Sequence, residues 1–195
     1  MDSERNTPNI SNVKIRFHLS PKVGKHITEN IKYWQKHCKK RPQYFLCTKF
    51  ANYIIFQNNL VYTIFTNLES TYFKINITGI RDLKKISGAV RSFCEHFGVL
   101  KEHRPTTVII DSIFASGTFK RCINLRKLKR SINSNLKSDF RVKFNCETAA
   151  AAYCRHRFYG SIGVFGNGKY IILGVKCKIQ LINLFQAMNA LIRKL

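Results

Sequence analysis

The sequence is short of acidic residues, and this shortage is its most informative feature. It has 10 Asp and Glu against 34 Lys and Arg in 195 residues, which gives a formal net charge of +24. So large an excess of positive charge predicts a polyanionic partner, and nucleic acid is the first candidate. The few carboxylates form no paired motif, and neither a nucleophile elbow nor a metal-binding triad occurs in the sequence. We therefore expect a protein that binds and is not an enzyme.

Long apolar runs and a secretory signal are also lacking. No apolar run approaches the length of a bilayer span, and the opening MDSERNTPNISN shows no signal pattern. We therefore expect an intracellular protein that is neither secreted nor bound to a membrane. Hydrophobic residues still make up 45% of the chain and aromatic residues 12%, which is enough to build a folded core.

The seven cysteines have no C-x-x-C spacing, so a structural zinc site is not indicated. Two short clusters, Cys94-Glu95-His96 and Cys154-Arg155-His156, place a cysteine and a histidine two residues apart, where they diverge or crowd. The favoured interpretation is that the cysteines are small buried hydrophobic residues, kept reduced in a cytosol or nucleus. We expect no metal and no cofactor.

The second half of the chain repeats the first. When Gly79 is aligned with Gly174, KINITGIR matches KYIILGVK, and an apolar stripe of helical period follows in both halves. The two stripes have the same spacing of four, three and four residues: Ile86, Val90, Phe93 and Phe97 in the first half, and Leu181, Phe185, Met188 and Ile192 in the second.

Each repeat shows the same order of parts. A β-rich strand opens each half, at Val13 to Phe17 and at Val108 to Phe119. In the first half an amphipathic helix follows, with its stripe at Ile27, Ile31, Trp34 and Cys38, whereas KRCINLRKLKRSINSNLKS in the second half predicts a loop with a short helix. The expected organisation is a flexible N-terminus over 1–10, repeat 1 over 11–98, a linker over 99–106 and repeat 2 over 107–195.

The stretch SIGVFGNGKYIILGVK predicts a tight hairpin. Val164 to Phe165 and Lys169 to Leu173 are expected to pair as antiparallel strands, with positive φ at both residues of the Asn-Gly turn. Strands followed by a long helix in each half give an α+β class, with an antiparallel sheet covered by helices on one face. By the two-residue period of a strand, Phe165, Ile171 and Leu173 share one face, which must be either buried or used.

Four motifs occur in order along the chain: KFANYIIF, TIFTNLESTYFKINITGIR, SIFASGTFKRCINL and VFGNGKYIILGVK. They resemble motifs of the TATA-box-binding protein (TBP) family, and the resemblance extends over nearly the whole length of this chain. The resemblance implies a tandem duplicated saddle. This is a curved antiparallel sheet with helices on the convex face, and its concave side binds and kinks duplex DNA in the minor groove.

The resemblance also implies the site residues. Phe50, Phe65 and Phe165 take positions where the family wedges phenylalanines between base steps. The fourth position falls near Thr148, where no Phe is available unless Phe144 shifts in. The residues corresponding to the base-reading floor are Asn12 and Ser112, Thr78 and Leu173, and Lys14 and Phe114, with Ile171 on the same face as Leu173. Because one half keeps the polar set better than the other, we expect a weakened or altered TATA preference.

Cations on the matching strands take the positions where the family touches phosphates: Lys49, Lys74, Arg81, Lys169 and Lys176, with Lys120 and Arg121 as additions. The basic run Arg126 to Arg130 has no counterpart in these motifs and would suit flanking DNA or an acidic protein.

We therefore expect a TBP-like transcription initiation factor, located in the nucleus or at a viral transcription site, with transcription factors or RNA polymerase subunits as protein partners. Its abundant Lys, Asn, Ile and Phe suit an A·T-rich genome, such as that of a large DNA virus or a parasite.

The alternative is a non-catalytic platform that keeps the fold for general nucleic-acid binding, RNA or single strands included, or for protein contacts. For Phe65 and Phe165, a place in the core and a wedge both remain open, as does the oligomeric state.

Overall fold

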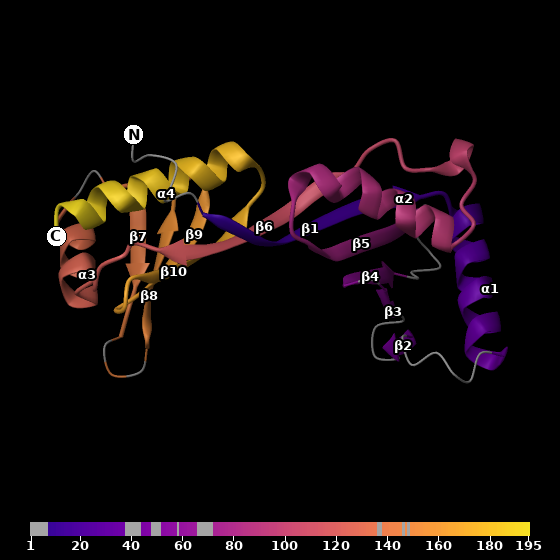
Figure 1. Ribbon diagram of the computed structural model, residues 1–195, viewed down its shortest axis with the longest axis horizontal. Coiled ribbons are helices and arrows are strands. Elements are labelled where there is room, and N and C mark those ends of the chain that lie inside the picture. Colours follow the sequence, from indigo (N-terminus) through magenta and orange to yellow (C-terminus); the bar gives the residue numbers. More distant parts are fainter. Residues whose placement is uncertain are drawn as a thin grey trace. The chain divides into compact units, whose positions relative to one another are not determined.

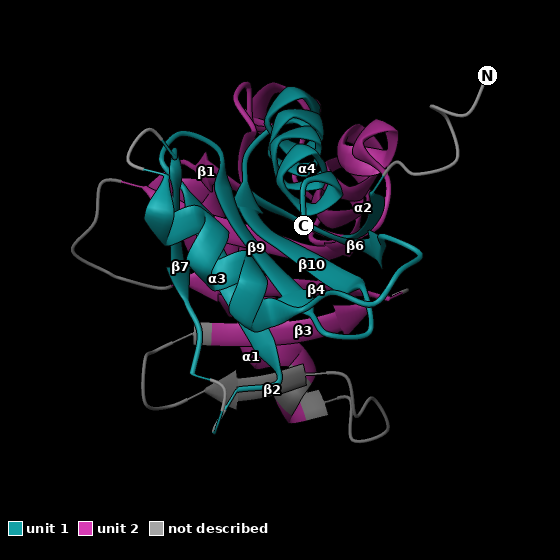
Figure 2. Cartoon of the chain, turned by 90° about the vertical axis from the view of Figure 1, so that its left-hand side faces the viewer, with its two compact units in different colours: residues 1–11, 112–195 teal, residues 12–111 magenta. Residues whose placement is uncertain are grey.

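The computed structural model describes residues 8–37, 44–47, 52–57, 59–65, 72–135, 138–145, 147 and 149–195. Asn12–Asp111 form one compact unit, here the N-terminal unit, and Ser112–Leu195 belong to a second, here the C-terminal unit (Figure 2). Both units combine an antiparallel sheet with helices, so the α+β class predicted from the sequence is confirmed.

The N-terminal unit has five strands in the order β2-β3-β4-β5-β1 (Figure 1). Its elements along the chain are β1 (Asn9–Leu19), whose first three residues belong to the other unit, α1 (Pro21–His37), β2 (Tyr44–Cys47), β3 (Asn52–Gln57), β4 (Leu60–Phe65), β5 (Phe73–Ile80) and α2 (Ile86–His96), with short 3-10 turns at Leu83–Lys85 and Lys101–His103.

The C-terminal unit repeats this order of parts, with strands arranged as β6-β10-β9-β8-β7. Its elements are β6 (Ile109–Thr118), whose first residues belong to the other unit, α3 (Leu125–Ser134), β7 (Phe140–Lys143), β8 (Ala151–His156), β9 (Gly160–Phe165), β10 (Lys169–Val175) and α4 (Lys178–Arg193).

The predicted helical stripes form the core of each unit. Helix α2 packs on β5, and helix α4 packs on β9 and β10. All eight stripe residues are buried except Ile86, which is half-buried. Burying one side of each amphipathic helix and one side of each sheet removes their apolar surface from water, which is the main force that stabilises such layers.

The predicted hairpin is confirmed, but its turn differs from the prediction. Strands β9 and β10 pair with Ile172 opposite Ile162 and Tyr170 opposite Val164. Positive φ is found at Gly168 (82°) and not at Asn167, so the expectation of two positive-φ residues is wrong. The loop has three residues, Gly166 to Gly168, because a glycine at its third position accepts the left-handed conformation that such loops require.

A β-bulge occurs at the same place in both repeats. The register of β5 against β1 shifts next to Gly79, and the register of β10 against β6 shifts next to Gly174. Both glycines have positive φ, 96° and 77°. The alignment of Gly79 with Gly174 therefore identifies a shared backbone feature, since such bulges favour glycine.

Helix α3 is more regular than the sequence predicted. The segment expected to be a loop with a short helix forms the ten-residue helix Leu125–Ser134. The side chain of Asn124 accepts a hydrogen bond from the Lys127 N–H at 3.0 Å and caps the helix, while Leu128 and Ile132 are buried. Four cations interrupt the apolar period of the sequence, but two buried residues four apart suffice to anchor one side of the helix.

The cysteine prediction holds for two of the four cysteines whose side chains the structure describes. Cys94 and Cys154 are buried, and burial raises the pKa of both thiols, that of Cys154 to about 12. Cys122 and Cys177 are exposed, so the expectation of burial is wrong for them. Within the described ranges, no three His, Cys, Asp or Glu side chains lie together as metal ligands. No helix in these ranges is long and apolar enough to span a bilayer.

Candidate nucleic-acid interface

Each sheet has one face that its helices do not cover, here called the open face. Along β1, Val13, Ile15, Phe17 and Leu19 are buried, whereas the intervening side chains are half-buried or exposed. Strand β10 and the middle of β6 show the same alternation, whereas in β9 Gly163 is buried together with its neighbours Ile162 and Val164. Because successive strand residues point to opposite faces, the less buried set defines the open face.

In the C-terminal unit, the strand register brings the predicted residues together in rows across the open face. Ile171 lies opposite Ser116 on one side and Gly163 on the other, and Gly163 lies opposite Tyr153. A second row begins at Leu173 and continues through Ser161 to Arg155 and Arg141. The predicted apolar residues Ile171 and Leu173 therefore share this face with arginines and a tyrosine.

Phe165 ends β9 beside a cation. Its half-buried ring lines a hollow of about 630 Å³ together with Lys169 and Ile171. A phenylalanine that is neither enclosed in the core nor fully exposed can be covered by a ligand, which favours the wedge interpretation over a place in the core.

Phe65 has the equivalent place in the N-terminal unit. It ends β4, is half-buried, and lies opposite Lys74 across the β4–β5 pair. The Nζ atom of Lys74 lies 5.0 Å from the centroid of the Phe65 ring. The ammonium group is thus held over the ring face by a cation–π contact. Both units therefore end the same strand with a phenylalanine next to a lysine.

The two predicted polar readers of the N-terminal unit lie close to the Gly79 bulge. The Oδ1 atom of Asn12 accepts a hydrogen bond from the Gly79 N–H at 2.7 Å, and Thr78 is half-buried next to that glycine. With its oxygen so engaged, the Asn12 amide offers its Nδ2 hydrogens. A donor of this kind matches the acceptors that A·T pairs display in the minor groove.

The remaining predicted residues lie as follows. Lys14, Ser112 and Phe114 are half-buried strand residues, and Arg81, Lys120, Lys169 and Lys176 are exposed. Phe50, Lys49 and Thr148 lie outside the described residues. Arg121 donates through Nη2 to the Ile192 carbonyl at 2.6 Å, so it satisfies the end of α4 instead of adding a free cation to the strand residues.

Sequence reasoning missed the part of the open face that β7 and β8 contribute. Tyr153 is 46% exposed, and Arg155, Arg141 and Lys143 are also exposed. A Cβ atom placed on Gly163 would lie 3.1 Å from the Tyr153 ring, so the glycine makes room for the tyrosine to lie over the neighbouring strand. The alternation in AAYCRH carries the signal, because Tyr153 and Arg155 are in phase while Cys154 and His156 are buried.

Behind β8, His156 supports the turn that leads into β9. It is buried, its Nδ1 accepts a hydrogen bond from the Phe158 N–H at 3.2 Å, and its ring stacks on Tyr159 at 4.5 Å. Burial lowers the pKa of His156 below its ordinary value of 6.5, against an opposing effect of Asp139. Both burial and the hydrogen bond therefore favour the neutral imidazole.

We expect the C-terminal unit to lose stability as the pH falls below about 6.5, because the unfolded state then binds a proton that the folded His156 resists. Above that pH the contribution is constant. Urea unfolding at pH 7.5 and pH 5.5 measures it. His156→Gln, which keeps an acceptor for the Phe158 N–H, should show a smaller pH dependence than the parent, and an unchanged dependence would contradict this account.

The fold class follows from these observations. Each unit runs strand, helix, four strands, helix, with one open sheet face, which defines a duplicated α+β fold of the TBP type. The solved structure of Methanococcus jannaschii TBP has this fold: it superimposes with a TM-score of 0.67, at 15% sequence identity, over 97% of this chain and 100% of that chain. The chain therefore has the TBP-like fold that its motifs predicted.

A second solved structure and the sequence comparisons indicate no further shared fold or family. A structure of A. aeolicus tRNASec in complex with M. kandleri SerRS covers 93% of this chain and 29% of that chain, at 10% identity and a TM-score of 0.35, which is too low to indicate a common fold. No protein-family model and no curated protein sequence matches the chain.

Proposed function

We propose that this chain is a TBP-like transcription initiation factor that binds duplex DNA through the minor groove, bends it and recruits transcription machinery. The main support is the equivalent placement of Phe65 and Phe165 at strand ends on open sheet faces of a TBP-like fold: Lys74 lies over the Phe65 ring, and Lys169 lines the same hollow as Phe165. A phenylalanine wedge unstacks a base step while the neighbouring ammonium group pairs with a phosphate, so the two functions lie side by side.

The charges of the chain suit this role and no catalytic one. Among the described residues, the exposed Arg81, Lys120, Lys169 and Lys176 are available to phosphates, while the carboxylates are few and dispersed. Binding and bending DNA through charged and aromatic side chains requires no catalytic residues. We therefore propose a non-enzymatic factor that acts in the nucleus or at a viral transcription site.

The test compares A·T-rich duplex, G·C-rich duplex and single-stranded DNA of equal length in gel-shift and bending assays. Preferential, bent binding to A·T-rich duplex supports the proposal, since minor-groove donors such as the Asn12 amide distinguish A·T from G·C. Equal, unbent binding to all three would overturn it in favour of a general nucleic-acid-binding platform. The apolar Leu173 at a base-reading position and the exposed Tyr153 on the same open face are the observation that favours this second candidate.

Binding should also depend steeply on salt. Because four described cations, Lys74, Arg81, Lys169 and Lys176, match phosphate-contacting positions, we expect the affinity for duplex DNA to fall roughly 10²–10³-fold between 50 and 200 mM salt. Lys169→Gln with Lys176→Gln should lower the slope of log K against log salt by about 2. Lys178→Gln, an exposed position on α4, is the control and should leave the slope nearly unchanged. An unchanged slope in the double variant would remove these lysines from the phosphate contacts.

A further inference from the structure

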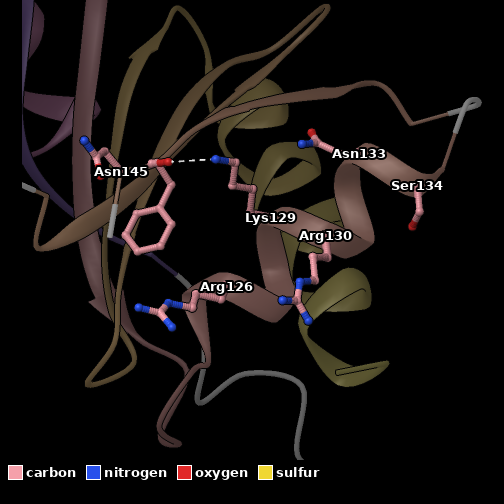
Figure 3. Close-up of a pocket in the computed structure, with 7 residues that line it drawn as sticks. Arg126, Lys129, Arg130, Asn133, Ser134 and Asn145 are labelled. Atoms are coloured by element: carbon pink, nitrogen blue, oxygen red, sulfur yellow. Dashed lines mark hydrogen bonds between the residues drawn. The ribbon is translucent and has the colours of Figure 1, made fainter. Parts of the chain in front are cut away.

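A pocket of about 700 Å³ lies beside α3 (Figure 3). Helix α3 packs on β7 and β8. In β7, Phe140 is buried and Val142 half-buried, opposite the buried His156 and Cys154, so Phe144, two residues beyond Val142, continues the helix-covered side. Arg141 and Lys143 belong to the other face. The α3 pocket is therefore distinct from the proposed duplex-binding surface.

Three cations line this pocket on one side of the helix. Arg126, Lys129 and Arg130 are spaced three and four residues apart, which places them together on the helix surface, and all three are exposed. Lys129 donates through Nζ to the Phe144 carbonyl at 3.1 Å and so spans the pocket (Figure 3). Arg126 and Arg130 form no ion pair with another described residue. Their guanidinium groups are free for an outside anion.

Few acidic residues are available to neutralise these cations. No acidic residue lines the pocket or occurs in α3, and residues 112–195 carry sixteen Lys and Arg against two acidic residues, Asp139 and Glu147. Like charges this close together on one helix repel one another. An arrangement with this cost is relieved when a polyanion binds.

The other lining residues favour nucleic acid over an acidic peptide. The half-buried Phe144 offers an aromatic ring, and the exposed side chain of Asn133 offers an amide donor and acceptor. The Oδ1 atom of Asn145 accepts a hydrogen bond from the Glu147 N–H at 3.0 Å, so this exposed side chain offers its Nδ2 hydrogens. A peptide of carboxylates requires cations alone, whereas a nucleotide also presents a base that stacks on an aromatic ring and bonds to amides. The pocket is large enough to admit a base with its phosphate.

We propose that the α3 pocket is a second nucleic-acid site, which binds a single-stranded segment with its phosphates on Arg126 and Arg130 and a base against Phe144. This site acts independently of the open faces. It would allow one chain to hold an unpaired strand while a duplex occupies the sheet. Guanidinium groups give bidentate contacts to phosphate oxygens, which accounts for arginine at the two unpaired positions.

The test uses the full chain and a fluorescent thymidine decamer that carries 4-thiothymidine, and it measures affinity by anisotropy and the contact by photo-cross-linking with peptide mapping. Arg126→Gln with Arg130→Gln should weaken binding at least 10-fold and remove the cross-link to the 144–145 segment. The control pair Lys127→Gln with Lys178→Gln removes the same charge from exposed positions outside the pocket and should cost less than about 3-fold.

Two further variants separate the possible occupants and the two sites. Phe144→Leu should weaken binding of the decamer without affecting a glutamate decamer. If that variant unfolds, Asn133→Ala at an exposed position provides the same comparison. Phe65→Ala with Phe165→Ala should keep the α3 cross-link, so failure of the sheet proposal and failure of this one remain distinguishable. Equal losses in the pocket and control pairs, or tighter binding of the glutamate decamer at the same residues, would overturn the assignment.

Discussion

Alanine at both Phe65 and Phe165 is expected to abolish the bending of an A·T-rich duplex while the fold remains intact. Both rings are half-buried at the ends of equivalent strands, and each lies next to a lysine. Because neither ring is enclosed in the core, its removal creates no sealed cavity, and the cost to stability stays far below the 3–5 kcal/mol typical of a core phenylalanine. We therefore expect the double substitution to weaken DNA binding and bending while the free energy of unfolding changes little.

The size of this effect follows from the contact that each ring makes. Base–aromatic contacts are each worth roughly 1–3 kcal/mol by alanine substitution, so two of them contribute at least about 2 kcal/mol, or roughly a 30-fold loss of affinity. Bending depends on the wedges more strongly than affinity does, because the phosphate contacts of the lysines survive the substitution. Fluorescence energy transfer between the duplex ends measures the bend, and a gel shift measures the affinity.

Tyr33→Ala is the matched control, since it removes an exposed aromatic ring from helix α1 and not from a sheet. It should leave both bend and affinity unchanged. Bending that survives in the double variant, and also in a triple variant with Phe50→Ala, would contradict the wedge role. In that case the two phenylalanines serve only to cover the sheet.

Much of the fold is predictable from the sequence because the relevant signals are local. The apolar stripes of α2 and α4 and the alternation in β9 and β10 recur every few residues, and these periods directly report which side of an element is buried. The repeat strengthens each signal, since Gly79 and Gly174 mark the same bulge in two independent stretches.

What sequence reasoning missed depends on partners that are distant along the chain. Tyr153 joins the row of Ile171 only through the register of β8, β9 and β10, and Arg121 is engaged by the Ile192 carbonyl 71 residues away. The regular helix α3 could not be predicted because four cations interrupt its apolar period and only two buried residues, Leu128 and Ile132, anchor it. Register and end contacts of this kind are decided by packing and not by local preference.

Gly79→Ala is expected to destabilise the N-terminal unit by about 3 kcal/mol or more. An alanine Cβ at this position would lie 2.2 Å from the Asn59 carbonyl oxygen, and φ is +96°. The left-handed conformation alone costs an L-residue about 1–2 kcal/mol, and the clash involves backbone, which cannot rotate away as a side chain can. Urea unfolding of parent and variant measures the difference.

Gly174 supplies the matched control in the other repeat. It occupies the equivalent bulge with φ +77°, but a Cβ atom there would meet nothing within 4 Å. Gly174→Ala should therefore cost about 1–2 kcal/mol, the conformational part alone. If the two substitutions lower the free energy of unfolding by the same amount, the contact with Asn59 is relieved by a small shift and does not contribute to the destabilisation.

The Gly79 substitution has a functional consequence that a simple loss of stability would not produce. The bulge changes the strand register between Ile77 and Ile80, and the Gly79 N–H holds the Oδ1 atom of Asn12. If the bulge is displaced, Thr78 and Asn12 lose their common placement, because a slip of one residue reverses the face to which a strand side chain points. We therefore expect folded Gly79→Ala protein, at low temperature, to lose preference for A·T-rich over G·C-rich duplex while it retains salt-dependent binding. Retention of that preference would separate the bulge from base reading and leave it a purely structural role.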